Sequence, residues 1–311
     1  MRVRFSARTH IGQRREVNQD AYATEERSPA TLLLVCDGMG GHAAGEVASQ
    51  LAVETIMARY GYDSAVSPDQ ALRDAFTSAN QEIYNQGRGT MGTTGVAALF
   101  LHNRLYVANV GDSRAYLVRE GQIDQISHDH SFVSDQLAAG LITPEQARTS
   151  SIRNIITRAL GHSGSVEVDL FERQLCAGDT VLLSSDGMHG LLADTEIAEV
   201  AGIFPPEEAV QRLVDMANAR GGPDNITVVI AQVDELDAAL PTTTPLNRPA
   251  DPEPPTELPL SRMGLLLASL TLLLLLSVGA LLWYSPGSPP QPLQERPVPT
   301  VGPISTVTPT R

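Results

Sequence analysis

Three acidic residues stand beside strand-like apolar runs, where a lone carboxylate is costly to bury. Asp37 and Asp186 each follow such a run, and Asp224 comes just before a third. Each has a Gly or Asn neighbour, so any one of them alone is typical of an ordinary turn. Carboxylates gathered at a buried edge repel one another and lose hydration unless a cation lies between them. Together, the three acids predict a site for divalent cations.

Oxygen ligands favour hard cations such as Mg²⁺ or Mn²⁺. Histidine and cysteine show no cluster at zinc-site spacing, because Cys36 and Cys176 are far apart and form no CxxC pair. We expect both cysteines to be buried, unpaired and without a nucleophilic role. Asp20 and Asp112 also stand at strand edges beside small or turn-forming residues, which extends the candidate acid set to five positions.

The segments that must position these acids alternate between strands and helices. Residues 101–106 and 118–124 have the pattern of hairpin turns, which predicts largely antiparallel sheets. Residues 45–60, 67–87 and 205–222 have amphipathic spacing and predict helices. The expected fold class is α+β, with helices covering antiparallel sheets.

Two of the helical segments carry more specific signals. Ser67 is expected as the N-cap of the second helix, with Gln70 completing a capping box and Gly87 ending the helix. The third helix is expected to end on Gly221. The core-facing stripe of the first helix is expected to consist of Val47, Leu51, Ala52 and Ile56.

Composition narrows the class of protein. The 311 residues, 42% of them hydrophobic, suffice for one globular domain with appendages. The net charge of -14 argues against a nucleic-acid surface, which needs clustered Lys and Arg. Residues 1–10 lack an apolar h-region, so they read as an edge strand and not as a signal peptide. The folded domain is expected to span residues 1–236.

The remaining chain contains a predicted membrane anchor. Residues 263–284 carry no charge and would span about 33 Å as a helix, which matches a bilayer core of about 30 Å. A buried core helix is the alternative, but the Leu-rich segment has no polar face. Residues 237–262 and 285–311 are Pro-rich and predict a linker and a disordered tail. Flanking charges do not settle the orientation.

Eight motifs occur in the order and spacing of a known family. The chain resembles the metal-dependent serine/threonine protein phosphatases, the type 2C or PPM family in its bacterial form, over about residues 3–234. This resemblance implies a central antiparallel β-sandwich flanked by helices on both faces (αββα), with a dinuclear metal centre in a cleft at one end. The motifs are RREVNQDAY, CDGMGGHAAGE, MGTTGVAAL, NVGDSRAY, SHDHSFVSDQLAAGLITPEQA, RNIITRALG, LLSSDGMHG and GGPDNITVV.

The resemblance also implies a role for each acid around two Mn²⁺ or Mg²⁺ ions. Asp37 would bridge the ions, and the backbone carbonyl of Gly38 would bind one of them. Asp186 and Asp224 would be ligands of the first metal, and Asp20 would help to hold the second through ordered water. Water or hydroxide between the ions would attack phosphorus in line, without a covalent phospho-enzyme.

Three further features follow from the same resemblance. Asp112, with Asp186, matches the site of a third, weaker metal. Arg15 matches the residue that grips the substrate phosphate through a planar guanidinium, and the adjacent Arg14 is the residue that could be confused with it. Residues 128–165 match a flap subdomain beside the active site that is expected to select substrates, with Thr143 capping a short helix.

The sequence departs from the family pattern at several positions. Met39 stands where eukaryotic relatives have His, which leaves the general acid unidentified and metal-bound water as the expected proton donor. Gln19 replaces a common Glu, and residues 150–154 replace a more usual His-Pro. The four histidines in or near the motifs are expected to be structural rather than acids; they are His42, His130, His162 and His189.

The leading interpretation is a membrane-tethered phosphatase with a cytoplasmic catalytic domain. It would remove phosphate from Ser and Thr of proteins and so oppose a Ser/Thr protein kinase. One alternative is a non-catalytic pseudophosphatase that binds phosphoproteins as a signalling scaffold, which loss of the metal acids would mark. Another is a metal-dependent hydrolase of small phosphoesters, which the same centre would serve.

Overall fold

The computed structural model describes residues 1–41, 43–60, 66–150, 152 and 154–238. The chain divides into two units, Met1–Thr242 and Thr243–Arg311, and every element below lies in the first. Among the helices of these described residues, none combines the length and apolar character needed to cross a bilayer. The predicted transmembrane segment 263–284 and the tail 285–311 lie outside the described residues, as does the linker from residue 239 onward.

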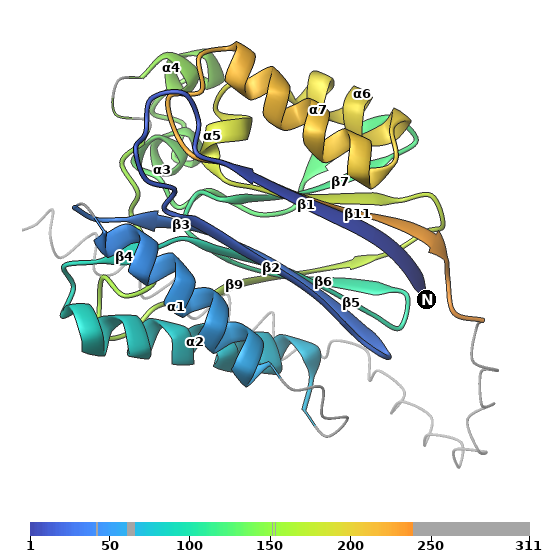
Figure 1. Ribbon diagram of the computed structural model, residues 1–311, viewed down its shortest axis with the longest axis horizontal. Coiled ribbons are helices and arrows are strands. Elements are labelled where there is room, and N and C mark those ends of the chain that lie inside the picture. Colours follow the sequence, from blue (N-terminus) through green and yellow to red (C-terminus); the bar gives the residue numbers. More distant parts are fainter. Residues whose placement is uncertain (42, 61–65, 151, 153, 239–311) are drawn as a thin grey trace, which may run out of the picture. The chain divides into compact units, whose positions relative to one another are not determined.

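Two antiparallel sheets face each other (Figure 1). In each, every pairing of neighbouring strands is antiparallel, as predicted. The first sheet has the order β1 (Arg2–His10), β11 (Ile226–Glu235), β10 (Thr180–Ser184), β7 (Arg114–Arg119) and β8 (Gln122–Gln125). The second has the order β2 (Asp20–Arg27), β3 (Ala30–Met39), β5 (Gly95–Leu101), β6 (Arg104–Val110) and β9 (Asp169–Gln174), and β4 (Gly92–Thr93) pairs with β3. β1 is an edge strand, and both predicted hairpins are present, as β5–β6 and β7–β8.

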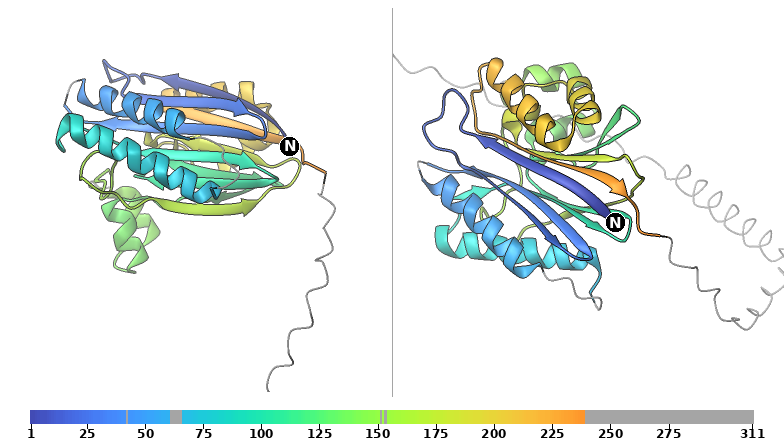
Figure 2. Two further views of the ribbon diagram at one scale, coloured as in Figure 1. Left: turned by 90° about the horizontal axis from the view of Figure 1, so that it is seen from below. Right: turned by 45° about the vertical axis from the view of Figure 1, so that its right-hand side comes forward.

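Helices cover both outer faces of the sandwich, which confirms the expected αββα layering (Figure 2). The second sheet is covered by α1 (Ala44–Arg59) and α2 (Pro68–Gly87), and the first by α6 (Asp194–Ile203) and α7 (Pro206–Ala219). The short α5 (Asp186–His189) follows β10. In the predicted flap lie α3 (Phe132–Ala138) and α4 (Pro144–Thr149), and Thr143 caps α4 with the expected capping box.

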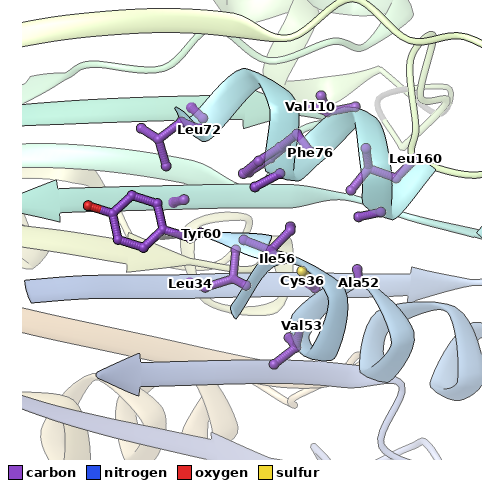
Figure 3. Packing of buried hydrophobic residues seen from close by; sticks show 14 of the residues in the cluster. Leu34, Cys36, Ala52, Val53, Ile56, Tyr60, Leu72, Phe76, Val110 and Leu160 are labelled. Carbon is purple, nitrogen blue, oxygen red and sulfur yellow. The ribbon is translucent and has the colours of Figure 1, made fainter. Parts of the chain in front are cut away.

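The central strand β3 is buried on both faces, which explains its uninterrupted apolar run. Leu33 and Val35 point into the layer between the two sheets. Leu34 and Cys36 point the opposite way, toward α1 and α2, where they pack near Ile56 (Figure 3). Because side chains alternate along a strand, only a strand covered by apolar layers on both sides can lack polar positions. This rigid strand carries Asp37.

The predicted core face of α1 is partly wrong. Val47 is 40% exposed, and the buried face includes Ala48, Ala52 and Ile56. The stripe that faces the sheet thus passes through Ala48 and not through the neighbouring Val47. Cys176 is also exposed, contrary to expectation, whereas Cys36 is buried; both are free thiols.

The ends of α2 and α7 differ from prediction in detail. Ser67 caps α2 by accepting a hydrogen bond from the Gln70 backbone N–H at 3.3 Å, but the Gln70 side chain donates to Asp74 and forms no capping box. Arg88, not Gly87, takes the left-handed conformation after the helix. α7 ends at Ala219, two residues before the expected Gly221.

Replacing Ser67 by alanine is expected to lower the free energy of unfolding by about 1 kcal/mol, because the capping oxygen is lost. Urea denaturation of the two proteins measures the difference. Ser67→Asp keeps a capping oxygen and should remain close to wild type, so an equal loss in both variants would contradict a role for the cap.

Candidate metal centre

Asp20 and Asp37 lie directly opposite each other on β2 and β3. β2 begins at Asp20, whereas β3 continues through Asp37, because the two residues that follow pair with β4. The sequence suggested that Asp37 comes after the end of its strand. In the structure it lies within the strand. Like charges at directly opposed positions destabilise a sheet. The repulsion between the Asp20 and Asp37 carboxylates is therefore present at one end of the second sheet.

The other predicted acids gather around this pair. Burial raises the pKa of Asp37 well above its usual value, and repulsion from Asp20, Asp186, Asp112 and Asp224 raises it further. Each of these four carboxylates is thus close enough to act on Asp37 electrostatically. The structure brings all five predicted acids into one electrostatic cluster, from strands and turns far apart in the sequence.

Two of the acids have pKa values near neutrality. Burial raises the pKa of Asp20 to about 7, although hydrogen bonds from Thr227 and Ser185 oppose the shift. Burial, followed by repulsion from Asp186, raises the pKa of Asp112 to about 7. Asp112 lies in the turn between β6 and β7. Such pKa values show that the metal-free fold disfavours the charged form of both carboxyls, which a bound cation would reverse.

The donor set fits hard divalent cations. Asp20 has one buried carboxylate oxygen, Oδ1, with no hydrogen-bond donor among the described residues, and such an oxygen suits a cation or its water. In the described part of the chain, however, no three acidic, histidine or cysteine side chains lie close enough together to hold one ion between them. The set is therefore not a closed protein cage, and a cation bound there would complete its coordination with water and carbonyl oxygen.

Arg15 and Asp224, predicted to have separate roles, form an ion pair. Arg15 Nη2 lies 2.7 Å from Asp224 Oδ2, and Asp224 Oδ1 accepts a hydrogen bond from the Asn225 backbone N–H at 2.8 Å. Both oxygens of Asp224 are thus engaged within the chain. The side chain of Arg15 is 49% exposed, so it can exchange this carboxylate for another anion.

Asn225 holds the segment that carries Arg15, a role that the sequence analysis missed. Its side-chain amide donates to the carbonyls of Ile11 at 2.9 Å and Val17 at 3.0 Å, and its Oδ1 accepts from the Gln19 backbone N–H at 2.8 Å. A buried Asn between an acid and a strand was the available signal. It ties the loop before β2 to the start of β11.

Glycine is required next to two of the acids. A Cβ at Gly38 would lie 2.0 Å from the carbonyl oxygen of Gly45, and a Cβ at Gly187 would lie 1.9 Å from that of Asn225. No side chain is compatible with either approach. The backbone after Asp37 and after Asp186 is therefore packed against neighbouring backbone. This packing fixes the backbone positions from which the two acidic side chains extend.

A groove of about 1180 Å³ opens beside the acids. Arg15, Asp112, Asp186 and Asp224 line one part of it. Side chains of α3, among them Leu137, also line it, as do residues of the segment after α5. A polypeptide segment can therefore reach the acid cluster along the predicted flap.

Two of the four histidines form hydrogen bonds within the fold, as expected for structural residues. His130 Nδ1 accepts from the Gly111 backbone N–H at 2.9 Å, and burial lowers the pKa of His130. His189 Nδ1 lies 3.0 Å from Ser184 Oγ, and burial lowers its pKa well below the usual value. His42 lies outside the described residues. The structural role expected of His162 stays a prediction.

The pKa of Asp112 gives a pH-dependent prediction for metal-free protein. Since its folded pKa is raised to about 7, the carboxyl is neutral below that pH when folded but ionised above about 4 when unfolded. Stability conferred by the neutral carboxyl is therefore lost as pH rises from about 4 to about 7. Asp112→Asn should gain stability over wild type across this window, by up to about 4 kcal/mol. Urea denaturation in chelator at several pH values measures the gain, and a constant difference would contradict the prediction.

Comparison with known proteins identifies the family. The family model described as "Protein phosphatase 2C" matches residues 3–136. The Mycobacterium tuberculosis serine/threonine protein phosphatase PstP is 41% identical over 242 residues, covering 76% of this chain but only 46% of PstP, so this chain spans about half the length of that relative. A Streptococcus pyogenes protein described as a putative protein phosphatase 2C-type is 36% identical over 245 residues, which is 99% of its length.

Solved structures agree with these matches. The crystal structure of M. tuberculosis PstP has a TM-score of 0.70 at 39% identity and covers 75% of this chain and 99% of that chain. The PstP catalytic domain described as a complex with two manganese ions has a TM-score of 0.68, at the same identity and coverage. The matched motifs, the αββα sandwich and the acid cluster together lead to one conclusion: the chain belongs to the protein phosphatase 2C family.

Proposed function

We propose that this chain is a metal-dependent protein phosphatase that hydrolyses phosphoserine and phosphothreonine in proteins. One observation carries the proposal. Five carboxylates converge beside a groove that also holds Arg15, and two of them, Asp20 and Asp37, directly oppose each other. The M. tuberculosis relative at 41% identity is named a serine/threonine protein phosphatase, and the S. pyogenes relative is described as a putative protein phosphatase 2C-type.

The site would hold two Mn²⁺ or Mg²⁺ ions. Asp37, the Gly38 carbonyl, Asp186 and Asp224 would bind them, with Asp20 supporting the second ion; Asp112 and Asp186 would offer a weaker third position. Bound divalent cations stabilise charge on phosphoryl oxygens and lower the pKa of water, which provides a nucleophile at neutral pH. The two cysteines have no place in this chemistry. Cys36 is buried, and burial raises the pKa of its thiol. Cys176 comes before β10, whereas Asp186 follows that strand.

Arg15 would bind and orient the substrate phosphate. Its guanidinium can donate two hydrogen bonds to non-bridging oxygens, and it lies in the groove beside the acids. In doing so it would leave Asp224, whose Oδ2 it now contacts at 2.7 Å. When Arg15 binds the phosphate, it would therefore also free Asp224 to serve as a metal ligand. Met39 cannot donate a proton, so the leaving oxygen would be protonated by water.

The scaffold alternative is not favoured, because Asp20, Asp37, Asp186 and Asp224 are all present and gathered. A comparison of substrates tests the other alternative, hydrolysis of small phosphoesters. With Mn²⁺, the full chain should release phosphate from a phosphothreonine peptide far faster than from a sugar phosphate. Preference for the sugar phosphate would overturn the assignment of protein substrates.

We also propose that residues 1–236 form the catalytic domain, with 128–165 as a substrate-selecting flap, and that 263–284 anchors it to a membrane. Supporting the anchor are the absence of charge and a helical length of about 33 Å. We place the catalytic domain in the cytoplasm, where it would oppose a Ser/Thr kinase, because its proposed substrates are phosphoproteins. The full chain should sediment with membranes and a chain ending at residue 238 should not; equal distribution of the two would refute the anchor.

A further inference from the structure

The Asp20 carboxylate is held by hydroxyl groups from the other sheet. Ser185 Oγ and Thr227 Oγ1 each lie 2.7 Å from the same oxygen, Asp20 Oδ2. Ser185 follows β10 and Thr227 lies on β11, whereas Asp20 begins β2 of the opposite sheet. All three residues are buried. These contacts therefore connect the two sheets at the acid cluster.

The direction of each hydrogen bond follows from its neighbours. Ser185 Oγ accepts from the Thr227 backbone N–H at 3.0 Å, so its own hydrogen is free for Asp20. Thr9 Oγ1 accepts from Asn18 Nδ2 at 2.9 Å and lies 2.8 Å from Thr227 Oγ1. Thr9 can thus donate to Thr227, which leaves the Thr227 hydrogen for Asp20. A chain of donors from Asn18 ends on the carboxylate.

This arrangement makes the two oxygens of Asp20 different. Oδ2 accepts two hydroxyl hydrogens, whereas Oδ1 is buried without a donor among the described residues. Hydrogen bonds to a carboxylate favour its charged form, and here they oppose burial and repulsion from Asp186. Oδ1 is consequently the oxygen left for a ligand from outside the chain.

We propose that Thr227 and Ser185 are positioning residues of the metal centre: their hydroxyls fix Oδ2 of Asp20 and so leave Oδ1 to face a divalent cation or its bound water. The inference rests on the proposed metal-dependent function. Partners that orient a ligand in this way tune metal affinity, and their loss typically weakens binding about 10- to 100-fold. Thr9 and Asn18 support Thr227 from β1 and the loop before β2.

Manganese binding by the full chain, measured by isothermal titration calorimetry, tests the role without relying on turnover. Thr227→Val removes the hydroxyl and nearly keeps the side-chain shape, whereas Thr227→Ser keeps the hydroxyl. Thr180→Val is the matched control, because Thr180 is equally buried on β10 but pairs with Gln232, at the far end of the strand from Ser184. Ser185→Ala tests the second donor should Thr227→Val fail to fold.

We expect Thr227→Val and Ser185→Ala to raise the Mn²⁺ dissociation constant of at least one binding step about 10- to 100-fold. Thr227→Ser and Thr180→Val should bind as wild type does. Wild-type affinity in folded Thr227→Val or Ser185→Ala, or weakened binding in Thr227→Ser equal to that in Thr227→Val, would overturn the inference. Failure of the wild-type chain itself to bind Mn²⁺ would instead refute the proposed function.

Discussion

Replacing Asp186 by asparagine is expected to lower phosphopeptide turnover by about 10²- to 10³-fold or more, the scale seen when one group that stabilises transition-state charge is removed. Asp186 repels both Asp37 and Asp112, so its carboxylate belongs to the centre of the cluster. An amide keeps the shape but supplies no negative charge for a cation. Steady-state kinetics with a phosphothreonine peptide and Mn²⁺ would measure the loss.

Stability separates this effect from misfolding. Because Asp186→Asn removes repulsion among buried acids, the metal-free variant should unfold at the same temperature as wild type or higher. Asp215→Asn, on the exposed side of α7, makes the same chemical change away from the site and should leave turnover unchanged. Full activity in Asp186→Asn, or equal losses in both variants, would refute the assigned role.

Arg15→Ala is expected to lower kcat/KM by about 100-fold, because the group proposed to orient the phosphate is lost. Arg14 supplies the matched control: it is the adjacent residue, carries the same charge and is exposed. Arg14→Ala should therefore stay near wild type. Arg15→Lys keeps the charge but not the two parallel donors, so its kcat/KM should fall between those of wild type and Arg15→Ala.

The two arginines can be told apart by one comparison of kinetics. If both alanine variants lost the same activity, a general effect of positive charge would explain the result and a phosphate-binding role for Arg15 would be wrong. Arg15→Ala also removes the partner of Asp224, so Mn²⁺ binding should not weaken and could tighten. A loss of Mn²⁺ affinity in this variant would contradict the proposed exchange.

Much of the fold was predictable from local sequence. Short links between apolar runs required hairpins, and the run that ends at Cys36 required a strand covered on both faces. The outward position of Val47 was not predictable, because spacing alone does not decide which of the adjacent apolar residues Val47 and Ala48 faces the sheet. The Gln70 side chain likewise had two local partners available, and it contacts Asp74 instead of completing the cap.

The acids of the site were predictable as a set, but their arrangement was not. Opposition of Asp20 and Asp37 depends on the β2–β3 register, and the Arg15–Asp224 pair joins residues from opposite ends of the domain. Thr227 and Ser185 gave no signal, because hydroxyl residues are common in and beside strands and no spacing links them to Asp20. Such contacts become visible only when the two sheets are packed together.

The central claim is that the gathered carboxylates act through divalent cations. The most direct test is phosphate release from a phosphothreonine peptide by the purified full chain in Mn²⁺, in excess chelator, and in chelator followed by excess Mn²⁺. Activity is expected in the first condition, none in the second and recovery in the third. Equal rates with and without chelator would contradict it.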